Sequence, residues 1–98
     1  MPEFTAQSAD EAVERAKKAG AQNLYFNGFT TGLTNGDVYV VALIHNEPVA
    51  VLDMSYTVAK TLAVSLSQII AAIEERAGRD IMTTKDIERI FQESGEKP

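Results

Sequence analysis

The sequence predicts an α+β protein, in which a three-stranded antiparallel meander packs on one long helix and a short helix lies at each end. Three observations support this order of α-β-β-β-α-α: period-two alternation in the middle of the chain, apolar positions at helical spacing on both sides of it, and turn or cap residues between them. The 98 residues are expected to form one domain, 1–98, with flexible ends at 1–7 and 94–98.

The first helix is expected at about residues 9–19. Ser8 and Glu11 form a capping-box pattern, alanines then recur at helical spacing, and Gly20 ends the series. Because alanine buries little area, this helix is expected to dock weakly, either in its own chain or swapped into a neighbouring subunit.

The first strand is expected at residues 24–29, where side chains alternate between two sides. Gly32 is expected to break this strand. Asn35-Gly36 then supplies the pair that favours two positive φ angles in a type I′ hairpin turn.

Two further strands are expected at residues 38–45 and 49–54. The segment 45–48 joins them, and its Pro48 fits only the start or the edge of a strand. The three strands therefore form a meander.

The main helix is expected to start at Ser55 or Thr57 and to run to Ala77, with Gly78 as the residue that ends it. A short last helix follows, opened by Thr83 with Asp86 three residues later. Its apolar stripe consists of Ile87, Ile90 and Phe91.

Composition limits the classes of partner. With 9 Lys plus Arg against 14 Asp plus Glu, the formal charge of −5 opposes binding to nucleic acid. No cysteine is present, so disulfides and thiolate metal sites are excluded. The most apolar run, 61–73, is shorter than the roughly 20 residues that cross a bilayer, and no secretory signal opens the chain, so a soluble cytoplasmic protein is expected.

More apolar surface is present than one small core can bury. The second strand is apolar on both sides, including Val41 and Leu43 on one of them. The main helix adds a row of small residues that permits close helix contact: Ala59, Ala63, Ser67 and Ala71. Either the terminal helices of the same chain cover these surfaces or a symmetric homo-oligomer does, and we favour the homodimer or a higher oligomer.

The candidates for chemistry are few. His45 lies beside Asn46 and Glu47 at a hairpin, which brings a base close to a carboxylate, although turn formation explains the same residues. Asp53 interrupts an apolar strand just before the main helix, where either it or Ser55 is expected to cap the helix. Alternatively, Asp53 faces a ligand at that corner. No metal site and no cofactor are expected.

Aromatic residues at strand spacing offer a second possibility for a ligand. Tyr25, Tyr39 and Tyr56 would line a pocket for a planar molecule, whereas such residues in strands more often belong to a core or an interface.

One run of the chain, "GDVYVVALIHNEPVAVLDMSYTVAKTLAVSLSQIIAAIEERAG" at residues 36–78, resembles a family of short bacterial and archaeal proteins classified as a domain of unknown function. In that family an extended stretch leads into a helix rich in "A-K-x-L". The matching residues here are Met54, Ser55, Ala59, Lys60 and Leu62. The resemblance implies the meander-plus-helix architecture and provides no catalytic residue.

These observations predict a small homo-oligomeric binding or adaptor module without catalytic activity. A second protein is a possible partner, through the apolar sheet or the 87–91 stripe; nucleic acid and membrane are not expected. Two alternatives stay open. One is a protein that sequesters a metabolite or nucleotide at the subunit interface, and the other is a small enzyme whose site is shared between subunits.

Overall fold

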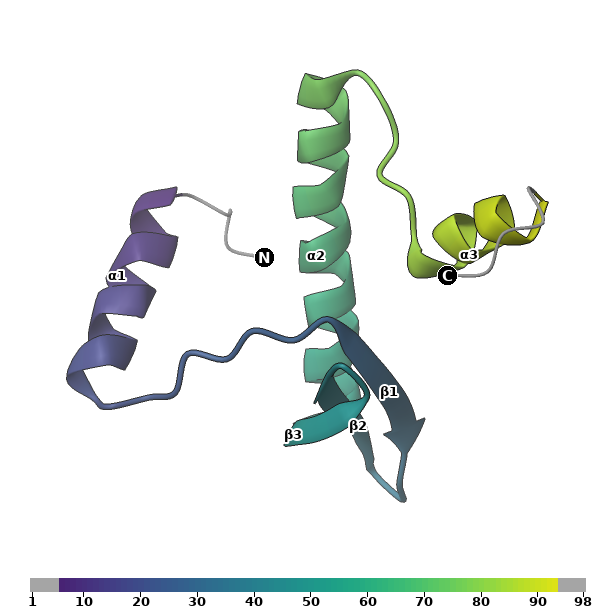
Figure 1. The fold of residues 1–98 in the computed structure, drawn as a ribbon. Coiled ribbons are helices and arrows are strands. Elements are labelled where there is room, and N and C mark those ends of the chain that lie inside the picture. Colours follow the sequence, from purple (N-terminus) through teal and green to yellow (C-terminus); the bar gives the residue numbers. More distant parts are fainter. Residues whose placement is uncertain (1–5, 94–98) are drawn as a thin grey trace. The chain divides into compact units, whose positions relative to one another are not determined.

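The computed structural model describes residues 6–93, and this part of the chain has the expected α+β class and element order (Figure 1). Its elements are α1 (Ala6–Lys18), β1 (Gly28–Leu33), β2 (Asp37–Ile44), β3 (Glu47–Ser55), α2 (Tyr56–Ala77) and α3 (Thr84–Glu93). The expected flexible ends fall mainly outside the described residues, while residues 6 and 7 belong to α1.

The chain divides into two compact units, Met1–Ala63 and Val64–Pro98. The first unit contains α1, the sheet and the first two turns of α2, and the second contains the rest of α2 and α3. We describe each unit by itself.

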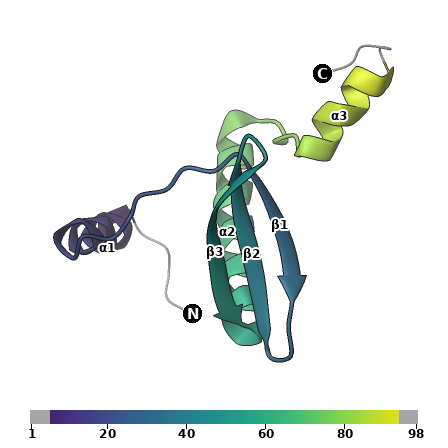
Figure 2. The same ribbon diagram turned by 60° about the horizontal axis from the view of Figure 1, so that its bottom comes forward.

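The sheet is a meander with strand order β1-β2-β3, so β2 lies in the middle and the other two strands are edges (Figure 2). β1 pairs antiparallel with β2 from Gly28↔Leu43 to Leu33↔Val38. β2 pairs antiparallel with β3, and the register shifts between Ala42 and Leu43. This shift leaves Val49 as an extra residue in β3.

The position of β1 corrects the sequence-based expectation, because the strand occupies 28–33 rather than 24–29. The hairpin register explains the difference. β2 ends at Ile44, and Gly28 already pairs with Leu43. Residues before Asn27 would therefore lie opposite the turn between β2 and β3, where no strand is present to pair with them. Gly32 does not break the strand but pairs with Tyr39.

The turns also differ from expectation. Gly36 has a positive φ of 125°, as predicted, but Asn35 does not, so Asn35-Gly36 is not a type I′ turn. The consecutive positive φ angles belong to His45 (50°) and Asn46 (69°), in the two-residue connection between Ile44 and Glu47. Histidine and asparagine tolerate this left-handed region better than most residues.

The C-terminal ends of α1 and α2 follow the sequence signals closely. At the end of α1, the Gly20 N–H donates to the Lys17 carbonyl over 3.1 Å and the Ala21 N–H to the Ala16 carbonyl over 2.9 Å. This pair of bonds, with Gly20 at a φ of 74°, is a Schellman motif. Gly78 ends α2 at a φ of 72°. At its other end α1 begins at Ala6, three residues before the expected start, so Ser8 and Glu11 lie inside the helix and do not form the predicted capping box at its start.

Three hydrogen bonds hold the start of α2. The Ser55 hydroxyl accepts a hydrogen bond of 3.2 Å from the Val58 N–H and so caps the helix. The Tyr56 hydroxyl donates to the Thr34 carbonyl (2.9 Å) and accepts from the Gly36 N–H (3.1 Å). The β1–β2 turn is therefore attached to the first residue of α2.

In the second unit, α3 opens with the predicted capping box. The Thr83 N–H donates to Asp86 Oδ2 (3.0 Å), and the Asp86 N–H donates to Thr83 Oγ1 (3.2 Å). Before it, the Ile81 N–H donates to Glu74 Oε2 over 2.8 Å, which attaches the connecting segment to the last turns of α2.

Candidate interaction surface

The strand register divides the sheet into two faces, because side chains alternate along each strand and paired residues share a side. The Ala42 face consists of Phe29, Thr31, Leu33, Val38, Val40, Ala42, Ala50, Leu52 and Met54. The Tyr39 face consists of Gly28, Thr30, Gly32, Tyr39, Val41, Leu43, Val51 and Asp53. Both faces are mainly apolar.

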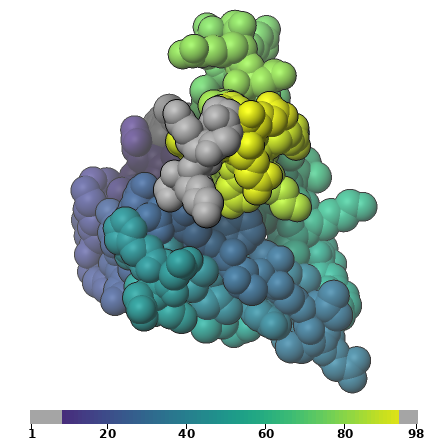
Figure 3. All heavy atoms as spheres, turned by 45° about the vertical axis from the view of Figure 1, so that its right-hand side comes forward, coloured from purple at the N-terminus to yellow at the C-terminus, as the bar shows by residue number. Residues whose placement is uncertain are grey.

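Neither face is buried within the described part of the chain. Ala42, at 2% exposure, is the one buried hydrophobic residue among residues 9–93. On the edge strands, by contrast, Phe29 is 63% exposed, Leu33 75% and Val51 59%. In the space-filling view the strands, coloured blue to teal, show their side chains at the surface (Figure 3). Side chains of these types are normally found inside a protein.

The ring of Tyr39 lies across the strand over Gly32. A Cβ atom built on Gly32 would lie 2.8 Å from Tyr39 Cε2 and closer still to the Cζ and hydroxyl atoms. The absence of a side chain at Gly32 therefore leaves room for the ring on the sheet. Sequence reasoning treated Gly32 as a strand breaker and missed this role. Glycine opposite an aromatic residue two strand positions inside a hairpin is the signal that would have revealed it.

Helix α2 has one apolar half and one polar half, as the rotation of about 100° per residue shows. The apolar half carries Val58, Ala59, Leu62, Ala63, Leu66, Ile69, Ile70 and Ile73. The polar half carries Thr57, Lys60, Thr61, Ser65, Ser67, Gln68, Glu74 and Glu75, and it also contains Val64, Ala71 and Ala72. Leu62, Leu66 and Ile73 in the apolar half are between 42% and 52% exposed.

By length and composition, α2 alone among the described helices is apolar enough to cross a membrane, and its 22 residues exceed the apolar run recognised from the sequence. Its polar half argues against contact with lipid on all sides, because every polar side chain in hydrocarbon carries a cost. An amphipathic helix of this kind instead presents one side for another surface to cover.

His45 serves the turn in which it lies. Its backbone N–H donates to Asn27 Oδ1 over 3.0 Å, and its Nδ1 lies 3.4 Å from Asn27 Nδ2. Together with the positive φ angle, these contacts give His45 a structural task at the end of the sheet.

The other predicted ligand residues do not gather around His45. Asp53 pairs with Tyr39 across the strands, six positions along β2 from His45, which corresponds to about 20 Å at 3.3 Å per residue. Tyr56 lies farther away, at the β1–β2 turn. A site within one chain cannot use His45 and Asp53 together, although two chains together still allow it. Ser55, rather than Asp53, caps α2.

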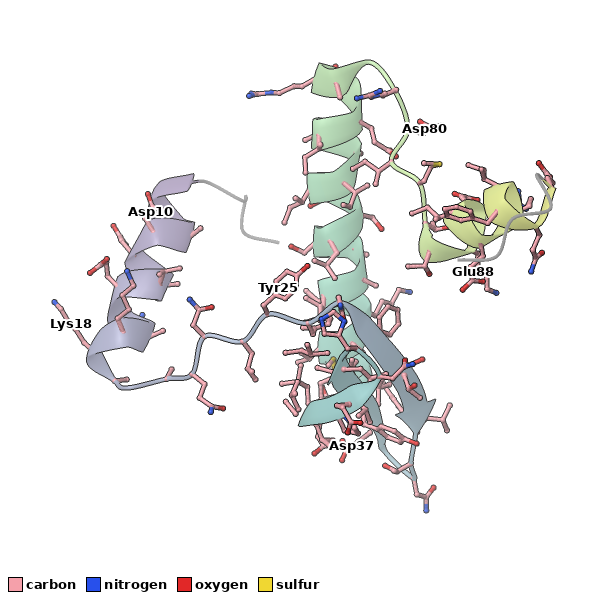
Figure 4. The ribbon with its side chains drawn as sticks, viewed as in Figure 1. Asp10, Lys18, Tyr25, Asp37, Asp80 and Glu88 are labelled. Atoms are coloured by element: carbon pink, nitrogen blue, oxygen red, sulfur yellow. The ribbon has the colours of Figure 1, made fainter. Side chains whose placement is uncertain are left out.

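Tyr25 lies on the segment between α1 and β1 and is 76% exposed (Figure 4). Two open hollows in the surface lie along α1 and are lined by residues of that helix and by Ala19 directly after it. They contain none of the predicted ligand residues. Among the described residues, no group of three His, Asp or Glu side chains is placed to hold a metal ion.

The predicted interface residues lie on the surfaces just described. Val41 and Leu43 are half-buried on the Tyr39 face. On α2, Ala59 is half-buried, while Ala63, Ser67 and Ala71 are exposed, and this row passes from the apolar half of the helix towards its polar half. Their role in self-association stays a prediction.

Comparison of the chain with protein-family models, with curated proteins and with solved structures gave no match. The resemblance of residues 36–78 to a bacterial and archaeal family therefore stays a prediction.

Proposed function

We propose that this protein is a small self-associating binding module without catalytic activity, whose apolar surfaces are covered by further copies of the same chain. The observation that carries the proposal is the contrast between one buried hydrophobic residue, Ala42, and the exposed large hydrophobic residues on both sheet edges and on α2. Burial of apolar area contributes about 25 cal/mol per Å², so covering these surfaces would stabilise the protein.

A second copy is favoured as the cover because both the sheet and α2 are self-complementary. Apolar faces without a dominant charge pattern pair with themselves in isologous contacts, and each such contact buries the surface of two subunits at once. If a second copy covers the apolar half of α2, that half does not contact lipid. We therefore propose the cytoplasm as the location.

The α3 stripe is a second proposed contact surface, for a protein other than this chain. Ile87 is 42% exposed and Ile90 51%, and Phe91 is half-buried beside them. Such a stripe matches the recognition of an amphipathic helix in a groove, with anchors at three- and four-residue spacing.

Light scattering coupled to size exclusion tests the proposal over a concentration range from micromolar to millimolar. The expected mass is a multiple of 10.7 kDa. A constant mass of 10.7 kDa would overturn self-association. Flotation with lipid vesicles tests whether lipid rather than a second copy covers α2. Protein that floats with vesicles and aggregates without them would show that lipid covers this helix.

A further inference from the structure

The free edge of β3 is the surface of the sheet best suited to a second copy. β2 lies between β1 and β3, so the outer edge of β3 has no partner strand within the described residues. An unpaired edge presents backbone N–H and C=O groups that readily accept another strand. We propose that two copies of this chain pair antiparallel through their β3 strands, which joins two three-stranded sheets into one of six strands.

The hydrogen-bond pattern identifies which amides of β3 point outward. The Thr34 N–H donates to the Asp37 carbonyl over 2.8 Å, so Asp37 and every second residue after it in β2 bond to β1. The residues between them bond to β3, where their partners are Ala50, Leu52 and Met54. Val51 and Asp53 therefore direct their backbone groups to the free edge.

The composition of β3 sets the register of the pairing. Pro48 and the register shift beside it prevent regular pairing at the start of the strand, which leaves the stretch from Ala50 to Met54. A two-fold axis at Leu52 avoids the register shift. It also allows the outward amides of Val51 and Asp53 to donate hydrogen bonds to the second copy. It places Leu52 opposite its copy and Ala50 opposite Met54 of the second copy, so one face gains a row of apolar pairs.

The same register separates the Asp53 carboxylates of the two copies. Its opposite residue is Val51 of the second copy, so the two carboxylates do not face each other directly. A two-fold axis at Asp53 itself would set like charges opposite and is disfavoured.

The edge of β1 is the weaker alternative. β1 has six residues against nine in β3, and two of the six are glycine. Glycine loses more conformational freedom on pairing than other residues and adds no side-chain contact. In β1 the outward amides belong to Phe29, Thr31 and Leu33, by the same alternation.

This inference rests on the proposed self-association, and the experiment separates the two. The test substitution is Val51→Pro, which removes an outward N–H but no bond between β2 and β3. The matched control is Thr31→Pro, which removes an outward N–H from the β1 edge. We expect Val51→Pro to lower the mass to that of a single chain, or the dissociation constant to rise at least about tenfold, while Thr31→Pro leaves the mass unchanged.

Amide hydrogen exchange of the unsubstituted protein gives a second measurement that needs no variant to fold. Pairing through β3 protects the Val51 and Asp53 amides about tenfold or more relative to the Thr31 amide, and this protection falls on dilution. Rapid exchange at Val51 and Asp53 in an oligomer would overturn the β3 pairing and leave self-association standing. A single-chain mass for the unsubstituted protein would overturn the proposed function instead.

Discussion

Gly32 shows how one residue without a side chain shapes the sheet. The ring of Tyr39 lies where the Cβ of any other residue would be. We expect Gly32→Ala to move the ring and to lower stability by about 0.5–1.5 kcal/mol, the usual cost of forcing a side chain off its preferred rotamer. Gly28→Ala is the matched control, because its Cβ would lie an ordinary 3.7 Å from Leu43 Cβ. Thermal melts measure both, and equal melting temperatures would contradict the role of Gly32.

Gly36 tests backbone strain at a single residue. Its φ of 125° is rarely adopted by residues with a side chain, while Asn35 beside it has no positive φ. We expect Gly36→Val to lower stability by about 1–2 kcal/mol, whereas Asn35→Ala changes it little. Chemical denaturation compares the two variants. An unchanged midpoint for Gly36→Val would show that the turn adopts another conformation in solution.

At the scale of elements, α3 depends on its capping box and therefore on pH. Hydrogen bonds from the Thr83 backbone and hydroxyl lower the pKa of Asp86 below its ordinary value of 3.8, and the charge of Arg89 acts in the same direction. A carboxyl group with a lower pKa in the folded state stabilises that state above the unfolded pKa. The contribution is complete above about pH 4 and is lost as the pH falls through the folded-state value.

We therefore expect the backbone chemical shifts of α3 to move towards coil values in acid, below pH 3.8. Asp86→Asn should remove this acid transition, because its side chain does not titrate. Glu88→Gln, in the middle of the same helix and outside the capping box, is the control and should keep the transition. NMR titration of the full chain measures all three proteins. A transition that persists in Asp86→Asn would assign it to another carboxyl group.

Three helix ends that are set by local chemistry could be predicted from the sequence, whereas the place of β1, which is set by pairing, could not. Gly20, Gly78 and the capping box of α3 act within a few residues of the ends they determine, and all three were predicted correctly. The place of β1 depends on the length of β2 and on the turn after it, which lie outside its own segment. Alternation at residues 24–29 was therefore a misleading local signal.

In the candidate site, too, features set by local sequence could be predicted and features set by strand pairing could not. The apolar faces followed from alternation within β2, so the sequence could predict that two sides would be apolar. The separation of His45 from Asp53 by about 20 Å depends on strand register, which sequence neighbours do not determine. Proximity along the chain was thus a poor guide to shared chemistry.

At the scale of the whole molecule, Asp53 is expected to limit the strength of self-association. In the β3 pairing with the axis at Leu52, the two Asp53 side chains lie diagonally, about 7–8 Å apart on the same face. Their repulsion is partly screened by water, so we expect Asp53→Asn to tighten the dimer by about twofold to fivefold. Analytical ultracentrifugation at low salt measures this change, and the control is Asp37→Asn on β2, one strand away from the joined edge. Weaker association of Asp53→Asn would show that the carboxylate makes a favourable contact.

The last prediction concerns Ala63, which lies in the apolar half of α2 within the row of small residues. A small side chain allows a close approach, and a larger one must push the neighbouring helix or sheet away. We expect Ala63→Leu to shift the protein towards lower mass while its helix content, measured by circular dichroism, stays the same.

Ala72→Leu is the matched control, because the same change then falls in the polar half of α2, beside Ser65 and Gln68. It should leave the mass unchanged. If Ala63→Leu instead lowers stability by about 1–3 kcal/mol without a change in mass, the row packs inside one chain. If neither property changes, the row faces solvent, and the second copy must be held by the β3 edge and the sheet faces alone.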